Sequence, residues 1–174
     1  MKATLEAINQ MQADGVIGKY AIGGAVGATF YLDPAATVDL DIFVELPDPE
    51  RGTLISLAPV YQFLKSRGCT ELDEYIAIGG WPVQFLPPAN PLEEEAIREA
   101  VATEAEGVST WIMRAEHLVA IALSVGRPKD HARILKFLEQ EAVDLEKLSV
   151  VLERHNLTSK WNDFGRRYPE GADE

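Results

Sequence analysis

The sequence predicts an α+β fold, in which a mixed β-sheet flanked by helices fills the first two thirds of the chain. Two observations lead to this prediction. Short β-leaning segments alternate with helical patterns up to residue 113, and only helical patterns follow. We therefore expect a core over 1–113, a C-terminal helical segment packed on it over 114–165, and a frayed tail over 166–174.

The first elements are a helix, a strand and a glycine turn. Apolar residues recur at three-residue intervals over 4–14, which is typical of an amphipathic helix. The segment 19–22 is short, apolar and β-leaning, and Gly23-Gly24 interrupts it. An Ala-rich run through Tyr31 then favours a second helix.

A second strand and a third helix come next. Over 38–44 acidic and aromatic side chains alternate with aliphatic ones, the pattern of a half-buried strand. After a Pro-rich break, apolar residues recur at helical spacing from Leu54 to Leu64. Gly68 is expected to end this helix.

The remaining sequence predicts a hairpin followed mainly by helices. Residues 75–78 and 81–86 are two short strands around the tight turn Gly79-Gly80, and Pro87-Pro88 ends the second. The later predicted elements are a helix over 93–99, a strand over 108–113, and helices over 115–125, 133–140 and 144–154.

The composition is that of an ordinary globular domain with an acidic surface. The chain has 174 residues, of which 47% are hydrophobic and 25% are charged, so it can fold as one compact unit. Its formal net charge of -12 argues against an extended nucleic-acid surface, which needs many Lys and Arg contacts to phosphate. The one local exception is the basic stretch 127–136.

The sequence predicts a cytoplasmic protein without a membrane anchor. Its longest apolar stretch, 118–125, is too short to span a bilayer, and the N-terminus lacks the apolar core of a signal peptide. The single cysteine, Cys69, cannot form an internal disulfide, and we interpret it as a structural thiol.

Asp39 and Asp41 are the first candidate site. Side chains alternate across a strand, so both carboxylates are expected on one face, where they can share a hard divalent cation such as Mg²⁺. The alternative is that both acids lie at a solvated strand end. Gly23-Gly24, between a strand and a helix, could present backbone N–H groups to a phosphate, or could be only a tight turn.

These segments together resemble the nucleotidyltransferase superfamily of polymerase-β type. The resemblance rests on Gly23-Gly24 followed by 37–42, and it extends over 83–86, 116–118 and 126–133. Those stretches are similar to small prokaryotic members, including those of toxin-antitoxin and abortive-infection systems. The resemblance implies transfer of a nucleoside monophosphate from an NTP to a hydroxyl acceptor, which would be a small molecule, a tRNA or a protein.

The resemblance also implies roles for individual residues. Asp39 and Asp41 would be catalytic and would hold Mg²⁺ or Mn²⁺. The implied nucleotide-binding residues are Gly23, Gly24, Thr37, Lys129 and Arg133. For the last two a second interpretation is open, namely that Asp130 offsets the helix dipole and the cations form a solvated helix start.

Two positions depart from the family pattern. Active family members commonly have a third acid on a neighbouring strand, and this chain has Gln84 at that position. Glutamine is neutral and cannot deprotonate a hydroxyl. Where members often carry Arg, two residues before Thr37, this chain has Ala35. Glu45, or Asp73 and Glu74, are the candidates to replace the third acid.

Two functional hypotheses and a third alternative follow. The chain is a metal-dependent nucleotidyltransferase, or it keeps the fold and a nucleotide pocket but works as a binding module through a partner protein. The coupled glycine turn and acid pair favour the first, and Gln84 and Ala35 favour the second. In the third alternative, the acids are surface residues of an unrelated α+β domain.

Overall fold

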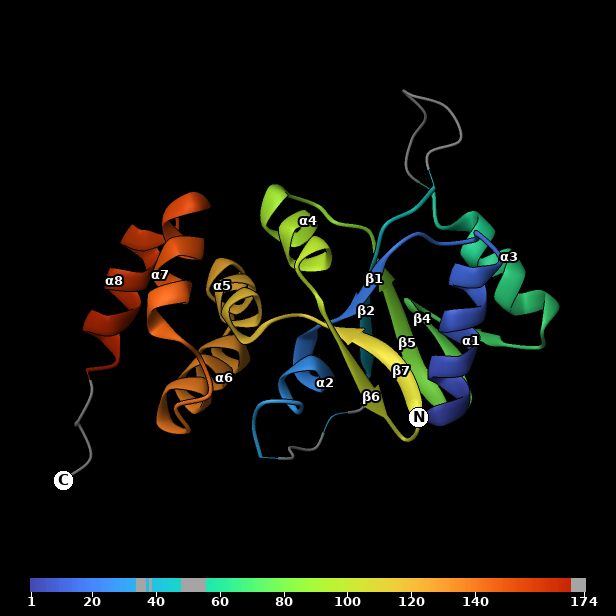
Figure 1. Ribbon diagram of the computed structural model, residues 1–174, viewed down its shortest axis with the longest axis horizontal. Coiled ribbons are helices and arrows are strands. Elements are labelled where there is room, and N and C mark those ends of the chain that lie inside the picture. Colours follow the sequence, from blue (N-terminus) through green and yellow to red (C-terminus); the bar gives the residue numbers. More distant parts are fainter. Residues whose placement is uncertain (34–36, 38, 48–55, 170–174) are drawn as a thin grey trace. The chain divides into compact units, whose positions relative to one another are not determined.

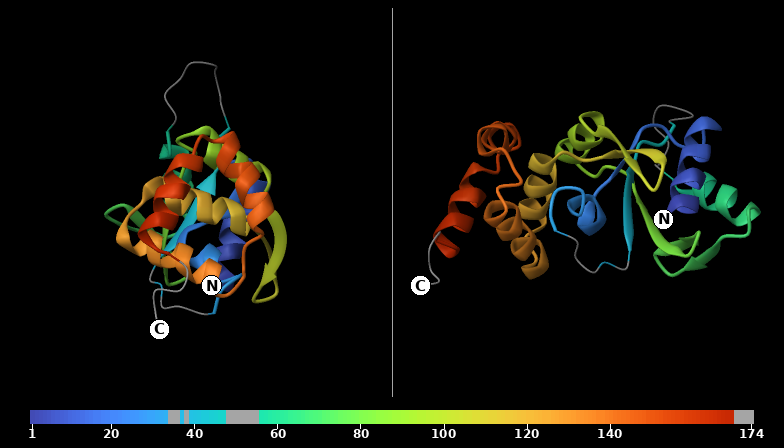
Figure 2. Two further views of the ribbon diagram at one scale, coloured as in Figure 1. Left: turned by 90° about the vertical axis from the view of Figure 1, so that its left-hand side faces the viewer. Right: turned by 60° about the horizontal axis from the view of Figure 1, so that its bottom comes forward.

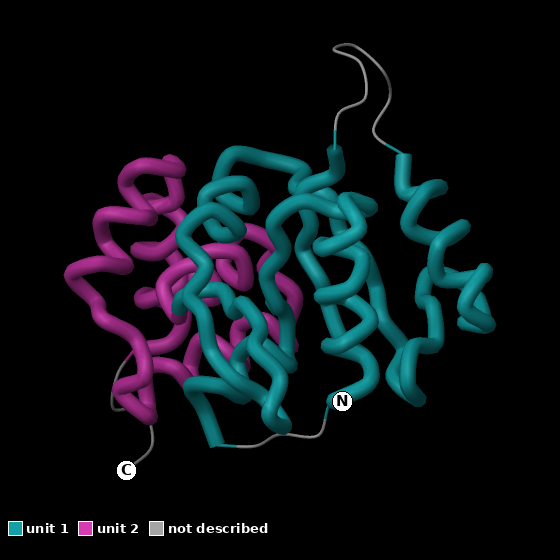
Figure 3. The backbone as a smooth tube through the Cα atoms, turned by 45° about the vertical axis from the view of Figure 1, so that its right-hand side comes forward, with its two compact units in different colours: residues 1–114 teal, residues 115–174 magenta. Residues whose placement is uncertain are grey.

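The protein divides into two compact units in a computed structural model. The structure describes residues 1–33, 37, 39–47 and 56–169. Unit 1 is Met1–Arg114 and unit 2 is Ala115–Glu174 (Figure 3). Each unit has its own buried core.

Unit 1 consists of a sheet and four helices in the described residues (Figure 1). In chain order these are α1 (Lys2–Ala13), β1 (Tyr20–Ile22), α2 (Gly24–Ala28), β2 (Leu40–Val44), α3 (Ala58–Ser66), β3 (Thr70–Leu72), β4 (Tyr75–Ile78), β5 (Trp81–Leu86), α4 (Pro91–Arg98), β6 (Val101–Ala105) and β7 (Val108–Ile112).

The sheet is mixed, as predicted, with the strand order β3-β4-β5-β2-β1-β7-β6. The central strand β2 runs antiparallel to β1 and parallel to β5. β1 in turn is parallel to β7. The glycine turn that follows β1 therefore lies near the middle of the sheet, next to β2, which contains Asp41.

Helices cover both faces of this sheet. In Figure 1, α1 and α3 lie on one face, and α2 and α4 lie on the other. α1 buries Leu5, Ile8 and Met11 completely against the first face, where alternate residues of β2 also point. The intervening residues of β2, Asp41 and Phe43, consequently face α2.

Two glycine signals in the sequence have the predicted conformations. Gly79 and Gly80 both have positive φ, 57° and 86°, as a two-residue hairpin turn between β4 and β5 requires. Gly68 has φ +82° and follows α3. Its N–H donates to Lys65 and the N–H of Cys69 donates to Leu64, the paired bonds of a Schellman cap.

Unit 2 is helical in its described residues. It contains α5 (Ala115–Val125), α6 (Pro128–Glu139), α7 (Leu145–Arg154) and α8 (Thr158–Arg167). Its core is formed mainly by Leu118, Val119, Leu123, Ile134, Phe137, Leu148, Leu152 and Phe164. Figure 2 shows α8, in red, beside α7, in orange, and these two helices are in contact.

Several predicted elements differ from the structure. The Ala-rich helix ends at Ala28 instead of Tyr31, because the N–H groups of residues 29–31 form i,i+3 bonds. α6 begins at Pro128, five residues before its predicted start, since proline suits a first helical turn and the Arg127 N–H donates to the Asp130 side chain.

Three elements were not predicted: β3, β6 and α8. α8 also continues to Arg167, so the predicted frayed tail from residue 166 begins inside a helix. Val38, Ala35 and the predicted helix start at Leu54 lie outside the described residues.

No helix in the described part of the chain combines the length and the apolar character needed to cross a membrane.

Candidate functional site

The glycine turn is tied to the strand that carries Asp41. The Gly23 N–H donates to the Asp41 carbonyl over 3.0 Å, and the Gly27 N–H donates to the Gly23 carbonyl over 2.8 Å. Gly23 thus follows the last residue of β1 and is the N-cap of α2. Its hydrogen bond to Asp41 fixes its backbone against β2.

Both glycines are required by close contacts. Gly24 has φ +57°, and a Cβ atom there would lie 1.9 Å from Oδ2 of Asp41. A Cβ atom on Gly23 would lie 2.6 Å from the Phe43 ring. Any side chain in this turn would therefore displace the Asp41 carboxylate or the Phe43 ring.

Asp39 lies immediately before β2 and is held by a tyrosine from the neighbouring hairpin. Its Oδ2 accepts a hydrogen bond of 3.3 Å from the Tyr75 hydroxyl. A hydrogen bond to Glu74, burial and the charges of Asp39 and Glu74 together raise the pKa of Tyr75 to about 12. Tyr75 consequently keeps its proton at neutral pH and acts as a donor to Asp39.

Gln84 lies beside Asp41 on the adjacent strand. The two residues are register partners in the parallel pair of β2 and β5, so their side chains share one face of the sheet. This is the position at which the resemblance implied a third acid. The site thus offers an amide oxygen and no third negative charge at that point.

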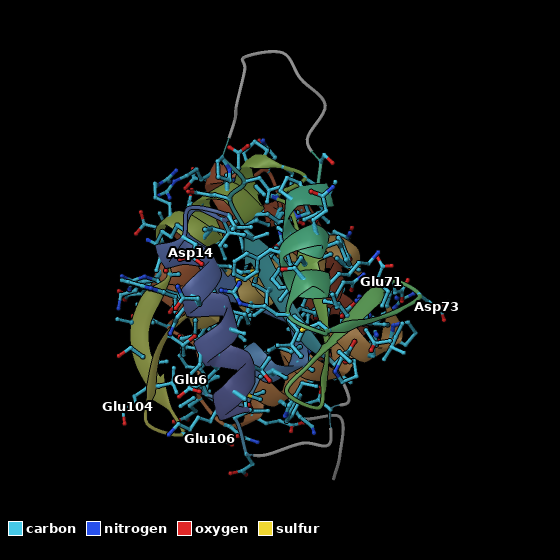
Figure 4. The ribbon with its side chains drawn as sticks, turned by 90° about the vertical axis from the view of Figure 1, so that its right-hand side faces the viewer. Glu6, Asp14, Glu71, Asp73, Glu104 and Glu106 are labelled. Carbon is cyan, nitrogen blue, oxygen red and sulfur yellow. The ribbon has the colours of Figure 1, made fainter. Side chains whose placement is uncertain are left out.

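The other acids considered as replacements do not complete a metal cluster. Among the described residues, no group of three or more His, Cys, Asp or Glu side chains could hold a metal ion. Glu45 follows the far end of β2, about 13 Å along the strand from Asp41. Asp73 lies at the outer end of the β3–β4 turn (Figure 4).

The donor set nevertheless fits one hard cation. Mg²⁺ is commonly bound by one or two carboxylates, with substrate phosphates and water completing its shell. Asp39 and Asp41 supply two carboxylates from neighbouring positions, and Gln84 supplies a neutral oxygen beside Asp41.

Thr37 precedes the two acids. Its hydroxyl donates to the Asp39 carbonyl over 3.4 Å, and it therefore supports the backbone in front of β2. Ala35, the position where the resemblance implied an arginine, is outside the described residues.

Lys129 and Arg133 lie on α6 in unit 2, whereas the glycine turn and the aspartates belong to unit 1. Lys129 is exposed. Arg133 lies 3.6 Å from the carboxylate of Asp130, which is 1% exposed and also accepts a 2.7 Å bond from Arg127.

Asp130 does more than offset the helix dipole. Burial acts to raise its pKa, but hydrogen bonding and charge attraction from Arg127, with a contribution from Arg133, hold the pKa below its usual range. Asp130 is therefore a buried anion that pairs with two arginines, and Lys129 is an exposed cation next to it in the sequence.

Tyr75 is the site residue that the sequence did not single out. Nothing in its local pattern distinguishes it from any other first residue of a short strand. It reaches Asp39 only because β4 and β5 fold back beside β2.

Solved structures with similar folds belong to nucleotidyltransferases. A solution structure of the antibiotic-resistance factor ANT(2″)-Ia matches with 18% sequence identity and a TM-score of 0.51, covering 96% of each chain. A crystal structure of an antigenic nucleotidyltransferase-like protein from Paracoccidioides brasiliensis matches with 13% identity and a TM-score of 0.58, covering 92% of this chain and 90% of that one.

No protein-family model and no curated protein matches the sequence. The structural likeness covers nearly the whole chain and includes the mixed sheet from which the glycine turn and the aspartate pair project. The chain therefore has a nucleotidyltransferase-like α+β fold, as the sequence predicted.

Proposed function

We propose that the protein is a metal-dependent nucleotidyltransferase that moves a nucleoside monophosphate from an NTP to a hydroxyl acceptor. The observation that carries this proposal is the contact of Gly24 with the Asp41 carboxylate. Through this contact, the Gly23-Gly24 turn, which could present backbone N–H groups to a phosphate, lies next to an acid that can bind a metal. Both belong to a nucleotidyltransferase-like fold.

In this proposal Asp39 and Asp41 hold a Mg²⁺ or Mn²⁺ ion, which neutralises negative charge on the NTP phosphates. Tyr75 holds Asp39 through its donated hydrogen bond. The absence of side chains on Gly23 and Gly24 lets the Asp41 carboxylate lie directly against the turn that would bind the triphosphate, and Thr37 supports the backbone before the two acids.

Lys129 and Arg133 of unit 2 stay candidates for the triphosphate on the sequence resemblance alone. Arg133 already pairs with Asp130. A compact ammonium with three donors suits phosphate oxygens.

The proposed reaction forms a bond between the acceptor oxygen and the α-phosphorus and breaks the bond to the β-phosphate, so that pyrophosphate leaves. The acceptor hydroxyl also loses a proton. Gln84 cannot take it, so the proton would pass to one of the two aspartates or to water.

A binding module without transfer activity is the second candidate, and Gln84 favours it. Its register with Asp41 puts a neutral amide where a third carboxylate would help to hold a second metal. Such a protein would bind an NTP with one metal ion and act through a partner protein.

Calorimetric titration of ATP, GTP, CTP and UTP with Mg²⁺ tests the nucleotide site. We expect metal-dependent binding in the wild type and its loss in an Asp39→Asn, Asp41→Asn double variant. An Asp73→Asn, Glu104→Gln double variant removes two negative charges from exposed positions (Figure 4) and should bind as the wild type does. If the wild type binds no NTP, the proposal is wrong.

Pyrophosphate release then separates the enzyme from the binding module. Small hydroxyl-bearing molecules are the first acceptors to supply, because one similar structure is that of an antibiotic-resistance factor. tRNA and protein acceptors follow. The predicted cytoplasmic location would give the enzyme its NTP. NTP binding without pyrophosphate release for any acceptor class would favour the binding module.

A further inference from the structure

Unit 2 contains a pocket of about 410 Å³ that the proposed function does not use. The end of α5, the start of α6 and one face of α8 form it. Its lining residues are Leu123, His131, Lys160, Asp163, Phe164 and Arg167. Three of these carry nitrogen donors, so the pocket differs in character from the acidic surface of the rest of the chain.

Gly126 leaves space between two of these nitrogen atoms. It follows α5 with φ +72°, and a Cβ atom there would lie 3.6 Å from Nζ of Lys160 and 3.7 Å from Nε2 of His131. The ammonium and the imidazole therefore border the same small volume. Because Gly126 has no side chain, nothing from that residue fills it.

The two nitrogen groups are held in place by other contacts. Nζ of Lys160 donates to the Ser124 carbonyl over 2.6 Å, which leaves two of its three hydrogens for another acceptor. The His131 ring meets Phe164 and Tyr168 edge to face, and its Nδ1 lies 3.3 Å from the Tyr168 hydroxyl. When that hydroxyl donates to Nδ1, Nε2 carries the ring proton and can donate into the pocket.

The charge of the lining is positive. Arg167 is exposed, and in the part of the chain that the structure describes it forms no ion pair. Asp163 is the single acid in the lining, and its carboxylate already pairs with Arg166, which is outside that lining. The lining thus has two cations, Lys160 and Arg167, and one carboxylate, that of Asp163, which pairs with Arg166.

We infer that this pocket binds a phosphate group carried by a small molecule, at a site separate from the glycine turn and the aspartate pair. A phosphate monoester has several acceptor oxygens and close to two negative charges, which suits an ammonium, a guanidinium and an imidazole donor around one volume. Every residue of the site belongs to unit 2, so the inference does not depend on the proposed transfer reaction.

The test is calorimetric titration of inorganic phosphate into the full chain. We expect a Lys160→Gln, Arg167→Gln double variant to bind phosphate at least about tenfold more weakly than the wild type, because two charged donors are removed. Lys136→Gln removes one positive charge from an exposed position on α6 outside the lining and should bind phosphate as the wild type does. If the double variant does not fold, Arg167→Gln alone replaces it, because Arg167 is exposed. This single variant should also bind phosphate more weakly than the wild type.

The same titration on the Asp39→Asn, Asp41→Asn variant separates this pocket from the proposed nucleotide site. Phosphate binding should persist there, even if NTP binding is lost. Acetate and a short RNA, titrated in parallel, should bind more weakly than phosphate. The inference is overturned if the wild type binds no phosphate, if Lys160 and Arg167 do not affect binding, or if acetate or RNA binds better.

Discussion

Gly24 lies directly against the Asp41 carboxylate, so close that a Cβ atom on Gly24 would be 1.9 Å from Oδ2 of Asp41. The two residues belong to neighbouring parts of the sheet. Gly24 follows the end of β1, and Asp41 is the second residue of β2. Their contact depends on the antiparallel pairing of those strands.

Gly24→Ala should abolish NTP binding and destabilise the protein. The methyl group would push away the Asp41 carboxylate, and the positive φ adds a backbone cost of about 1 kcal/mol. Gly68→Ala is the matched control, since Gly68 has φ +82° and open space where a Cβ atom would be. It should lose a similar 1 kcal/mol or so in urea unfolding but bind NTP normally. Equal NTP binding by both variants would contradict a functional role for the contact.

Gln84→Glu should strengthen Mn²⁺ binding roughly tenfold or more, because the number of charged ligands tunes the affinity of such sites. Without metal the variant should be less stable by about 0.5–1 kcal/mol, since two carboxylates would then be adjacent across β2 and β5. Paramagnetic resonance of bound Mn²⁺ measures the affinity, and Gln84→Met controls for loss of the amide. If wild-type transfer activity is absent, its appearance in Gln84→Glu would identify the lost acid.

Local sequence signals predicted the parts of the fold that local chemistry decides. The two-glycine hairpin turn and the Schellman cap at Gly68 are examples, because only glycine adopts those backbone angles at low cost. β3 was missed because all three of its residues are exposed and show no alternation. α8 was missed because Trp161 and Phe164 are its only large apolar residues.

The candidate site was predictable in its residue types and not in its contacts. The resemblance led to Asp39, Asp41 and the position of Gln84 on a neighbouring strand, and the strand register agrees with that position. The contact of Gly24 with Asp41 and the bond from Tyr75 to Asp39 depend on how separate strands align. A single sequence contains no direct signal for such pairings. The roles of these residues, and the likeness to toxin-antitoxin members, stay predictions.

Tyr75→Phe should weaken metal and NTP binding about fivefold, since it removes the hydrogen bond that the Tyr75 hydroxyl donates to Asp39. The fold should be retained, because the hydroxyl is the only group removed. A hydrogen bond to Glu74, burial and the charges of Asp39 and Glu74 raise the pKa of Tyr75 to about 12, so the difference between variant and wild type should be the same at pH 7 and pH 10. Tyr61→Phe, on α3, is the control. A difference that disappears by pH 10 would show that the Tyr75 proton is lost earlier than we expect.

Asp130→Asn should destabilise unit 2 by about 2 kcal/mol at neutral pH, because it removes the charge that Arg127 and Arg133 pair with at a buried position. Glu71→Gln breaks an exposed ion pair with Lys65 and should cost less than about 1 kcal/mol. Urea unfolding followed by circular dichroism measures both. A cost for Asp130→Asn as small as that for Glu71→Gln would mean that the buried ion pairs do not stabilise the helices.

The cost of Asp130→Asn should also depend on pH in a definite direction. The arginines hold the pKa of Asp130 in the folded protein below that of an unfolded aspartate, about 3.9. The stabilisation is therefore complete well above pH 4 and is lost as the pH falls through the lower, folded-state value. Unfolding measured from pH 7 down to pH 3 should show the wild type losing stability faster than Asp130→Asn at the acid end, so that the gap between them narrows. A gap that widens on acidification would contradict a depressed pKa at Asp130.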